Sequence, residues 1–68
     1  MFKMDNMEKI IEAMKYLKER DEFITLRKLH KVTKLSKTTI EKYLMFLIGS
    51  GKVRRRNIGN QYIYELIE

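Results

Sequence analysis

The chain contains no cysteine and a single histidine, so neither disulfide bonds nor a Cys/His zinc site can hold its fold together. Its 68 residues suffice for one domain (1–68), and a domain this small buries only ~60% of the surface that its unfolded chain exposes. Stability must therefore come from well-packed helices, from a partner subunit, or from both. No acid–base, metal-ligating or phosphate-binding glycine pattern is present, so we expect no enzyme activity, no metal and no cofactor.

Positive charge is concentrated in the middle of the chain. Residues 27–56 contain ten Lys or Arg and one acid, Glu41, a net charge of +9, whereas the segments on either side are slightly acidic. Such asymmetry is typical of a surface that faces phosphate groups. The pattern indicates a nucleic acid as partner, and a solvated lysine-rich face is the alternative.

No apolar run approaches the ~20 residues that a membrane span needs, and the first residues do not resemble a secretory signal. We therefore expect a cytoplasmic, intracellular or nucleoid-associated protein without membrane contact. The surplus of Lys, Glu and Ile fits a thermophile, although an AT-rich genome gives a similar bias.

Three helices are predicted, each from a capping residue followed by an apolar stripe at helical period. The capping residues are Asp5, Thr25 and Ser36. The inward stripes are Met7, Ile10, Ile11, Met14 and Leu17; then Leu26, Leu29 and Val32; then Ile40, Tyr43, Leu44, Leu47 and Ile48. Between the first two helices, Phe23–Thr25 is predicted to form a minimal strand.

A hairpin is predicted after the third helix, with two strands around a Gly59-Asn60 turn. A turn at that position sets Val53 opposite Leu66 and Arg54 opposite Glu65, whereas a one-residue slip would turn one strand over. The predicted fold is therefore mainly α with a small β-hairpin.

The order of helix, short strand, helix, tight turn, helix and basic hairpin resembles the winged helix-turn-helix. Residues 29–40 look like its helix-turn-helix, and residues 40–44, Leu47 and 51–53 look like its recognition helix running into the wing. Over roughly residues 5–67 the sequence is similar to MarR- and ArsR-type bacterial and archaeal transcription regulators. The resemblance implies sequence-specific binding of double-stranded DNA, with recognition helix 36–49 in the major groove and wing 52–66 on the backbone or minor groove.

The resemblance and the side-chain chemistry together give three sets of expected DNA contacts. In the recognition helix they are Ser36, Lys37, Thr38, Glu41 and Lys42. In the wing they are Arg54, Arg55, Arg56, Asn57 and Asn60. On the second helix and the turn, contacts to the DNA backbone are expected from Arg27, Lys28, Lys31 and Lys34.

Within these sets, Arg56 is the strongest candidate of the wing. Arg54 is expected beside Glu65, and Arg55 over the ring of Tyr64 as a cation–π pair. Glu41 either accepts a hydrogen bond from a cytosine amino group or pairs with Lys37 or Lys42 along the helix.

Three features depart from the resembled family. Lys34 stands where the turn usually has Gly and must either adopt positive φ or reshape the turn. His30 replaces a small residue and is expected to be partly buried. Met45 and Phe46 cannot both face the core, so one of them is expected to pack on residues 1–4 or to form, with Phe2, an apolar surface for a second subunit. This motivates the prediction of a homodimer.

Two other functions remain compatible with the sequence. The first is nonspecific or architectural DNA binding, which differs only in whether the recognition helix touches bases or phosphates. The second is a protein-interaction winged helix, against which the +9 segment argues. RNA binding through Tyr62 and Tyr64 is a weaker alternative, because these rings are expected to pack within the hairpin.

Overall fold

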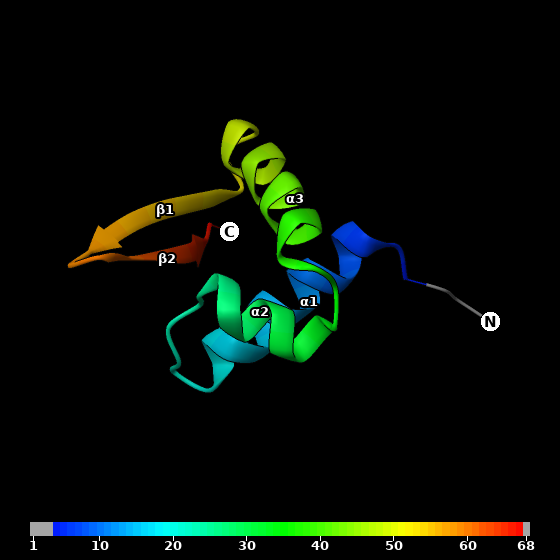
Figure 1. The fold of residues 1–68 in the computed structure, drawn as a ribbon, viewed down its shortest axis with the longest axis horizontal. Helices are drawn as coiled ribbons and strands as arrows, with labels where there is room; N and C mark the ends of the chain where they lie inside the picture. Colours follow the sequence, from blue (N-terminus) through cyan, green and yellow to red (C-terminus); the bar gives the residue numbers. More distant parts are fainter. Residues whose placement is uncertain (1–3, 68) are drawn as a thin grey trace.

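Three helices followed by a two-stranded hairpin make up the part of the chain that this computed structural model describes, residues 4–67. The elements are α1 (Asn6–Glu19), α2 (Leu26–Thr33), α3 (Lys37–Gly49), β1 (Val53–Ile58) and β2 (Gln61–Leu66). The helices pack together, and the hairpin, here called the wing, extends from one side of them, away from the start of α1 (Figure 1). The predicted mainly α fold with a wing is confirmed.

All three predicted helix caps are confirmed. The side-chain oxygens of Asp5, Thr25 and Ser36 each accept a hydrogen bond from the backbone N–H three residues further on, at 2.8, 3.2 and 3.2 Å. Each cap satisfies an amide of the first turn that has no partner within the helix. The caps therefore set where each helix begins, in particular the start of α3.

The core is one cluster of apolar side chains drawn from all three helices, the loop between α1 and α2, and the base of the wing. Its buried members are Ile10, Ala13, Met14, Leu17, Ile24, Leu29, Ile40, Leu44, Leu47, Val53 and Tyr64. The predicted stripes of α1 and α3 are confirmed. The prediction for Val32 was wrong, since its side chain is 42% exposed. Three-residue steps fall short of a full helical turn, so the stripe drifts out of the core at the end of α2.

The hairpin has the predicted register, with Val53 opposite Leu66 and Arg54 opposite Glu65. Gly59 opens the turn with φ of 62°, which suits a residue without a Cβ. The predicted minimal strand is confirmed as a single bridge, in which the Tyr64 N–H donates to the Ile24 carbonyl at 2.8 Å. The bridge anchors the base of the wing beside the start of α2.

The turn between α2 and α3 is held by two contacts that involve His30. Lys34 adopts the left-handed conformation, with φ of 66°, and its N–H donates to the His30 carbonyl at 2.8 Å. The positive φ expected of Lys34 is confirmed. The burial expected of His30 was wrong, because the ring lies in an exposed position with Nδ1 at 2.6 Å from the Leu35 carbonyl oxygen. The ring takes its polar partner from the turn rather than packing on α3.

Candidate nucleic-acid interface

The wing has two chemically different faces, because successive side chains of a strand point to opposite sides. The inner face, which continues from the core, carries Val53, Arg55, Asn57, Tyr62, Tyr64 and Leu66. The outer face carries Arg54, Arg56, Ile58, Gln61, Ile63 and Glu65. The three successive arginines are therefore divided between the faces, and only Arg55 belongs to the inner one.

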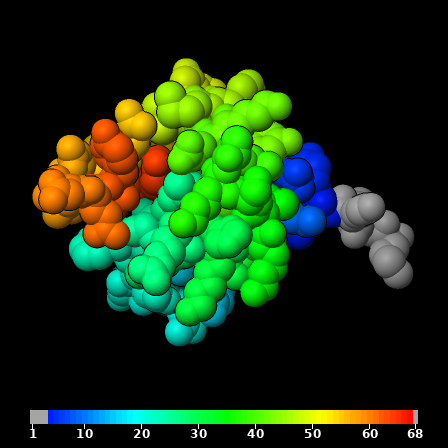
Figure 2. All heavy atoms as spheres, in the orientation of Figure 1, coloured from blue at the N-terminus to red at the C-terminus, as the bar shows by residue number. Residues whose placement is uncertain are grey.

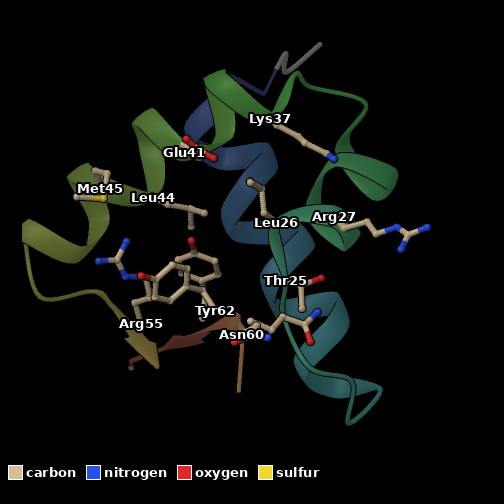
Figure 3. A pocket seen from close by; sticks show the side chains of 12 residues that line it. Thr25, Leu26, Arg27, Lys37, Glu41, Leu44, Met45, Arg55, Asn60 and Tyr62 are labelled. Carbon is tan, nitrogen blue, oxygen red and sulfur yellow. The ribbon is translucent and has the colours of Figure 1, made fainter. Parts of the chain in front are cut away.

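A hollow of about 470 Å³ lies between α3, the start of α2 and the wing. We call it the recognition hollow. It is lined by Thr25, Leu26, Arg27, Lys37, Glu41, Leu44, Met45, Arg55, Asn60, Gln61, Tyr62 and Tyr64. Figure 2 shows the wing standing beside the surface of α2 and α3, and Figure 3 shows the side chains that converge on the hollow.

One stripe of α3 faces this hollow. Lys37, Glu41 and Met45 follow one another at intervals of four residues and therefore share a side of the helix. The Lys37 side chain reaches toward α2, where Arg27 projects to the same side (Figure 3). Three cations, one from each of α2, α3 and the wing, thus line the same hollow as a single carboxylate, that of Glu41.

Glu41 lies in this basic surrounding without an ion pair to any residue between 4 and 67. The alternative that Glu41 pairs with Lys37 or Lys42 is therefore not what the structure contains. Its carboxylate is exposed toward the hollow and can accept hydrogen bonds from a bound molecule.

Arg55 lies over the ring of Tyr62, with the guanidinium carbon 4.5 Å from the ring centroid. The prediction of Tyr64 as its partner was wrong. Tyr64 is directly across from Arg55 but only 7% exposed, since its ring belongs to the core. Tyr62 is 50% exposed and lies diagonally across, within the reach of a long side chain. The stack holds Arg55 at the rim of the recognition hollow.

On the outer face, Arg56 Nη1 lies 3.6 Å from Glu65 Oε1. The ion pair expected for Arg54 is thus made by Arg56, because Glu65 reaches the diagonal neighbour rather than the residue directly opposite. Neither arginine lines the recognition hollow.

The remaining predicted DNA contacts lie around the hollow rather than in it. Thr38 and Lys42 are exposed on α3 beyond its rim, Asn57 is exposed on β1, and Lys34 is exposed in the turn. Ser36 is exposed but its hydroxyl is engaged, since it caps α3 and donates to Thr39 Oγ1 at 2.8 Å. Of the wing set, Asn60 lines the hollow together with Arg55.

A second hollow of about 490 Å³, here called the flank hollow, lies on the other side of the start of α2. Its lining residues are Phe23, Thr25, Arg27, Lys28, Lys31, Gln61 and Ile63. Three of the four cations predicted on α2 and the turn, namely Arg27, Lys28 and Lys31, are brought together here.

Lys28 is also part of a charge cluster with the preceding loop. Its Nζ lies 3.5 Å from Glu22 Oε1, and Arg20 Nε donates to Glu22 Oε2 at 2.9 Å. The hydrogen bond from Arg20, assisted by the charge of Lys28, lowers the pKa of Glu22 from its ordinary value.

Met45 and Phe46 are both exposed, at 56% and 66%. Met45 lines the recognition hollow and Phe46 does not, because adjacent residues of a helix point in directions about 100° apart. Phe2 falls outside the described residues, so the subunit surface expected from the three side chains stays a prediction.

Sequence reasoning missed several residues of the hollows. Thr25 was expected only as a cap, and Tyr62 as a ring packed within the hairpin, although strand alternation already places it on the same face as Arg55. No signal in the sequence indicated that Phe23 would be 67% exposed.

Residues 4–67 contain no group of three or more His, Cys, Asp or Glu side chains that could hold a metal ion. Over the same residues, no helix is long and apolar enough to span a bilayer.

The chain is similar in structure to the apo form of the Zalpha domain of zebrafish PKZ. The two share 27% sequence identity, the alignment covers 87% of this chain and 91% of that one, and the TM-score is 0.70. The fold is thus a winged helix of the Zalpha kind. The sequence matches no protein-family profile and no curated protein. The resemblance to MarR- and ArsR-type regulators stays a prediction.

Proposed function

We propose that this chain is a nucleic-acid-binding winged helix that binds double-stranded DNA through the recognition hollow and acts as a sequence-specific transcription regulator. The observation that carries the proposal is that three cations from three separate elements, Arg27, Lys37 and Arg55, line one hollow. Such an arrangement suits phosphate groups, which dominate the affinity of protein–DNA complexes. The likeness to the Zalpha winged helix supports a nucleic-acid-binding module.

In this proposal α3 lies in the major groove and the wing follows the adjacent backbone. Lys37 and Arg27 contact phosphates at the mouth of the hollow, and Arg55 approaches the backbone from the wing. Thr38 and Lys42, exposed on α3, are placed to reach base edges.

The position of Glu41 is an argument for sequence-specific rather than nonspecific DNA binding. A carboxylate repels phosphate, so a surface selected only for phosphate contact gains nothing from a carboxylate at its centre. A base that presents a donor, such as the cytosine amino group, offsets this cost by donating to Glu41. Nonspecific or architectural binding is the second candidate, and the three convergent cations are the observation that supports it.

The test is a fluorescence-anisotropy titration of random duplex DNA and of duplex selected from a random pool, each repeated across salt concentrations. We expect the selected DNA to bind at least ~1000-fold more tightly than random DNA. Equal affinities with a steep salt dependence would identify an architectural binder. Absence of binding at low salt would contradict both proposals.

Lys37→Ala and Lys15→Ala form a matched pair for the same titration. Both remove one positive charge, but Lys15 lies on α1 with its side chain 47% exposed and does not line the hollow. We expect Lys37→Ala to weaken binding by about 10-fold and to reduce the salt slope by about 1. Lys15→Ala should change the affinity by about 2-fold or less. Equal effects of the two variants would show that net charge matters and the hollow does not.

A homodimer would place two α3 helices on half-sites about 34 Å apart, giving a partly palindromic operator. Light scattering at micromolar concentration tests this proposal directly. A dimer mass that falls to the monomer mass in Phe46→Ala would support it, and a monomer mass of the unaltered protein would contradict it.

A further inference from the structure

The flank hollow adjoins the recognition hollow. They share the lining residues Thr25, Arg27 and Gln61, which form a common rim at the start of α2 and the end of the wing. A polynucleotide strand that leaves the recognition hollow past Arg27 therefore enters the flank hollow directly. The two hollows have similar volumes, about 490 Å³ and about 470 Å³.

The most unusual side chain of the flank hollow is Phe23. Its ring is 67% exposed, although a phenylalanine normally gains free energy by leaving water. The backbone that presents it is fixed, because neighbouring Ile24 is bridged to β2 and Thr25 caps α2. Ile63, which lines the same hollow, is apolar and only 7% exposed. Phe23 thus offers an open aromatic face on a rigid base.

On the side of Phe23 that faces the flank hollow, the charged side chains are all cations and favour an anionic occupant, whereas Asp21, Glu22 and Glu65 line a separate hollow on its other side. Arg27 and Lys31 line the flank hollow and make no ion pair with any residue in the described range 4–67. The Lys28 ammonium is shared with Glu22, whose carboxylate does not itself line the hollow. An exposed ring flanked by cations is the combination by which proteins bind single-stranded nucleic acid, through stacking of a base and contact with its phosphates.

We propose that the flank hollow binds an unpaired nucleotide that continues one strand of the duplex held in the recognition hollow. The base stacks on Phe23, and Arg27 and Lys31 contact the phosphates on either side of it. The Gln61 amide, at the shared rim, hydrogen-bonds an edge of the base. The inference rests on the proposed function, because the bound duplex positions the extension. It adds that the protein prefers duplex ends or junctions that carry a single-stranded extension.

The test compares a blunt duplex with the same duplex carrying a short thymine extension on its 5′ or its 3′ end. We expect one of the two extensions to tighten binding by roughly 5- to 100-fold, the range for one stacked base. Phe23→Ala should abolish that gain while leaving the affinity for the blunt duplex within about 2-fold, because the ring does not line the recognition hollow.

Tyr16→Ala is the control, because Tyr16 is another exposed aromatic side chain, 49% exposed, that lies on α1 and lines neither hollow. It should retain the full gain from the extension. Phe23→Leu keeps apolar area without a flat ring and should lose most of the gain. If Phe23→Leu or Phe23→Ala kept the gain, stacking on this residue would be ruled out.

A spectroscopic readout is independent of affinity. The chain contains no tryptophan, so Phe23→Trp introduces a single indole whose emission reports contact with a base. We expect its emission to change on binding the extended duplex and to stay constant on binding the blunt one. Normal binding of the blunt duplex without a gain from either extension overturns this inference alone. Failure to bind any duplex overturns it together with the proposed function.

Discussion

The two faces of the wing differ more than their sequence suggests. On the inner face, Arg55 stacks on Tyr62 and points its charge at the recognition hollow. On the outer face, Arg56 lies against Glu65, beside a hollow that Asp21 and Glu22 also line. Three adjacent arginines therefore have two different surroundings.

This difference shows that a run of like charges along a strand is not a charged surface. Side-chain alternation sends every second residue to the other side of the sheet, so the local density of charge on each face is about half of what the sequence implies. The inner face carries one arginine, which lies over a tyrosine ring, and the outer face carries two arginines, one of which is paired with Glu65.

The largest expected effect is on stability. It tests whether the inner face of the wing belongs to the core near Tyr64 and is a binding surface near Tyr62. Tyr64→Ala removes a ring that is 7% exposed and should lower the free energy of unfolding by about 3 kcal/mol. Tyr62→Ala, on the same face but 50% exposed, should lower it by about 1 kcal/mol or less. Urea unfolding measures both, and similar values for the two variants would remove the distinction between base and tip.

The next effect compares the faces directly. Arg55→Ala should weaken duplex binding by about 10-fold, since a charged hydrogen-bonding contact is lost. Arg54→Ala removes the same charge from the outer face and should weaken binding by only about 2-fold, through long-range electrostatics. Anisotropy titrations at two salt concentrations distinguish the variants. A larger loss for Arg54→Ala would mean that DNA approaches the outer face.

The smallest effect concerns the acids near the outer face. The hydrogen bond from Arg20 lowers the pKa of Glu22 below its ordinary 4.5 in the folded protein. A lowered folded pKa gives a stabilisation that is present above pH 4.5 and is lost as the pH falls through the lowered value. Unfolding measured from neutral to acid pH should therefore show a shallower pH dependence in Glu22→Gln, and Arg20→Ala should reproduce this change. A pH dependence that neither substitution altered would contradict the assignment.

Much of the fold follows from local sequence signals. Asp5, Thr25 and Ser36 are capping residues with strong preferences, and the Gly59-Asn60 turn fixes the hairpin register without reference to the rest of the chain. The positive φ of Lys34 also follows from local constraint, because the chain must turn there whatever residue is present. These features could be predicted because each depends on only a few neighbouring residues.

The candidate site was less predictable, because it depends on how separate elements meet. Tyr64 packs in the core, so its ring is not available to Arg55. Arg55 therefore lies over Tyr62. Phe23 is exposed next to Ile24, which is bridged to Tyr64, a residue 40 positions further along the sequence. The prediction for His30 was wrong because its ring is exposed and takes the Leu35 carbonyl, five residues further on, as its polar partner.

The Ile24 bridge also gives the molecule a mechanical property. Ile24 is tied to β2 by the bridge, and the next residue, Thr25, holds the first turn of α2 by its cap. One peptide unit therefore links the wing to the helix that supports α3. A force applied to the wing tip by a bound strand would be transmitted to α2 without an intervening flexible segment. The Tyr64 amide is therefore the point at which movement of the wing would be passed to α2, and the hydrogen-exchange rate of that one proton would report how stable the connection is.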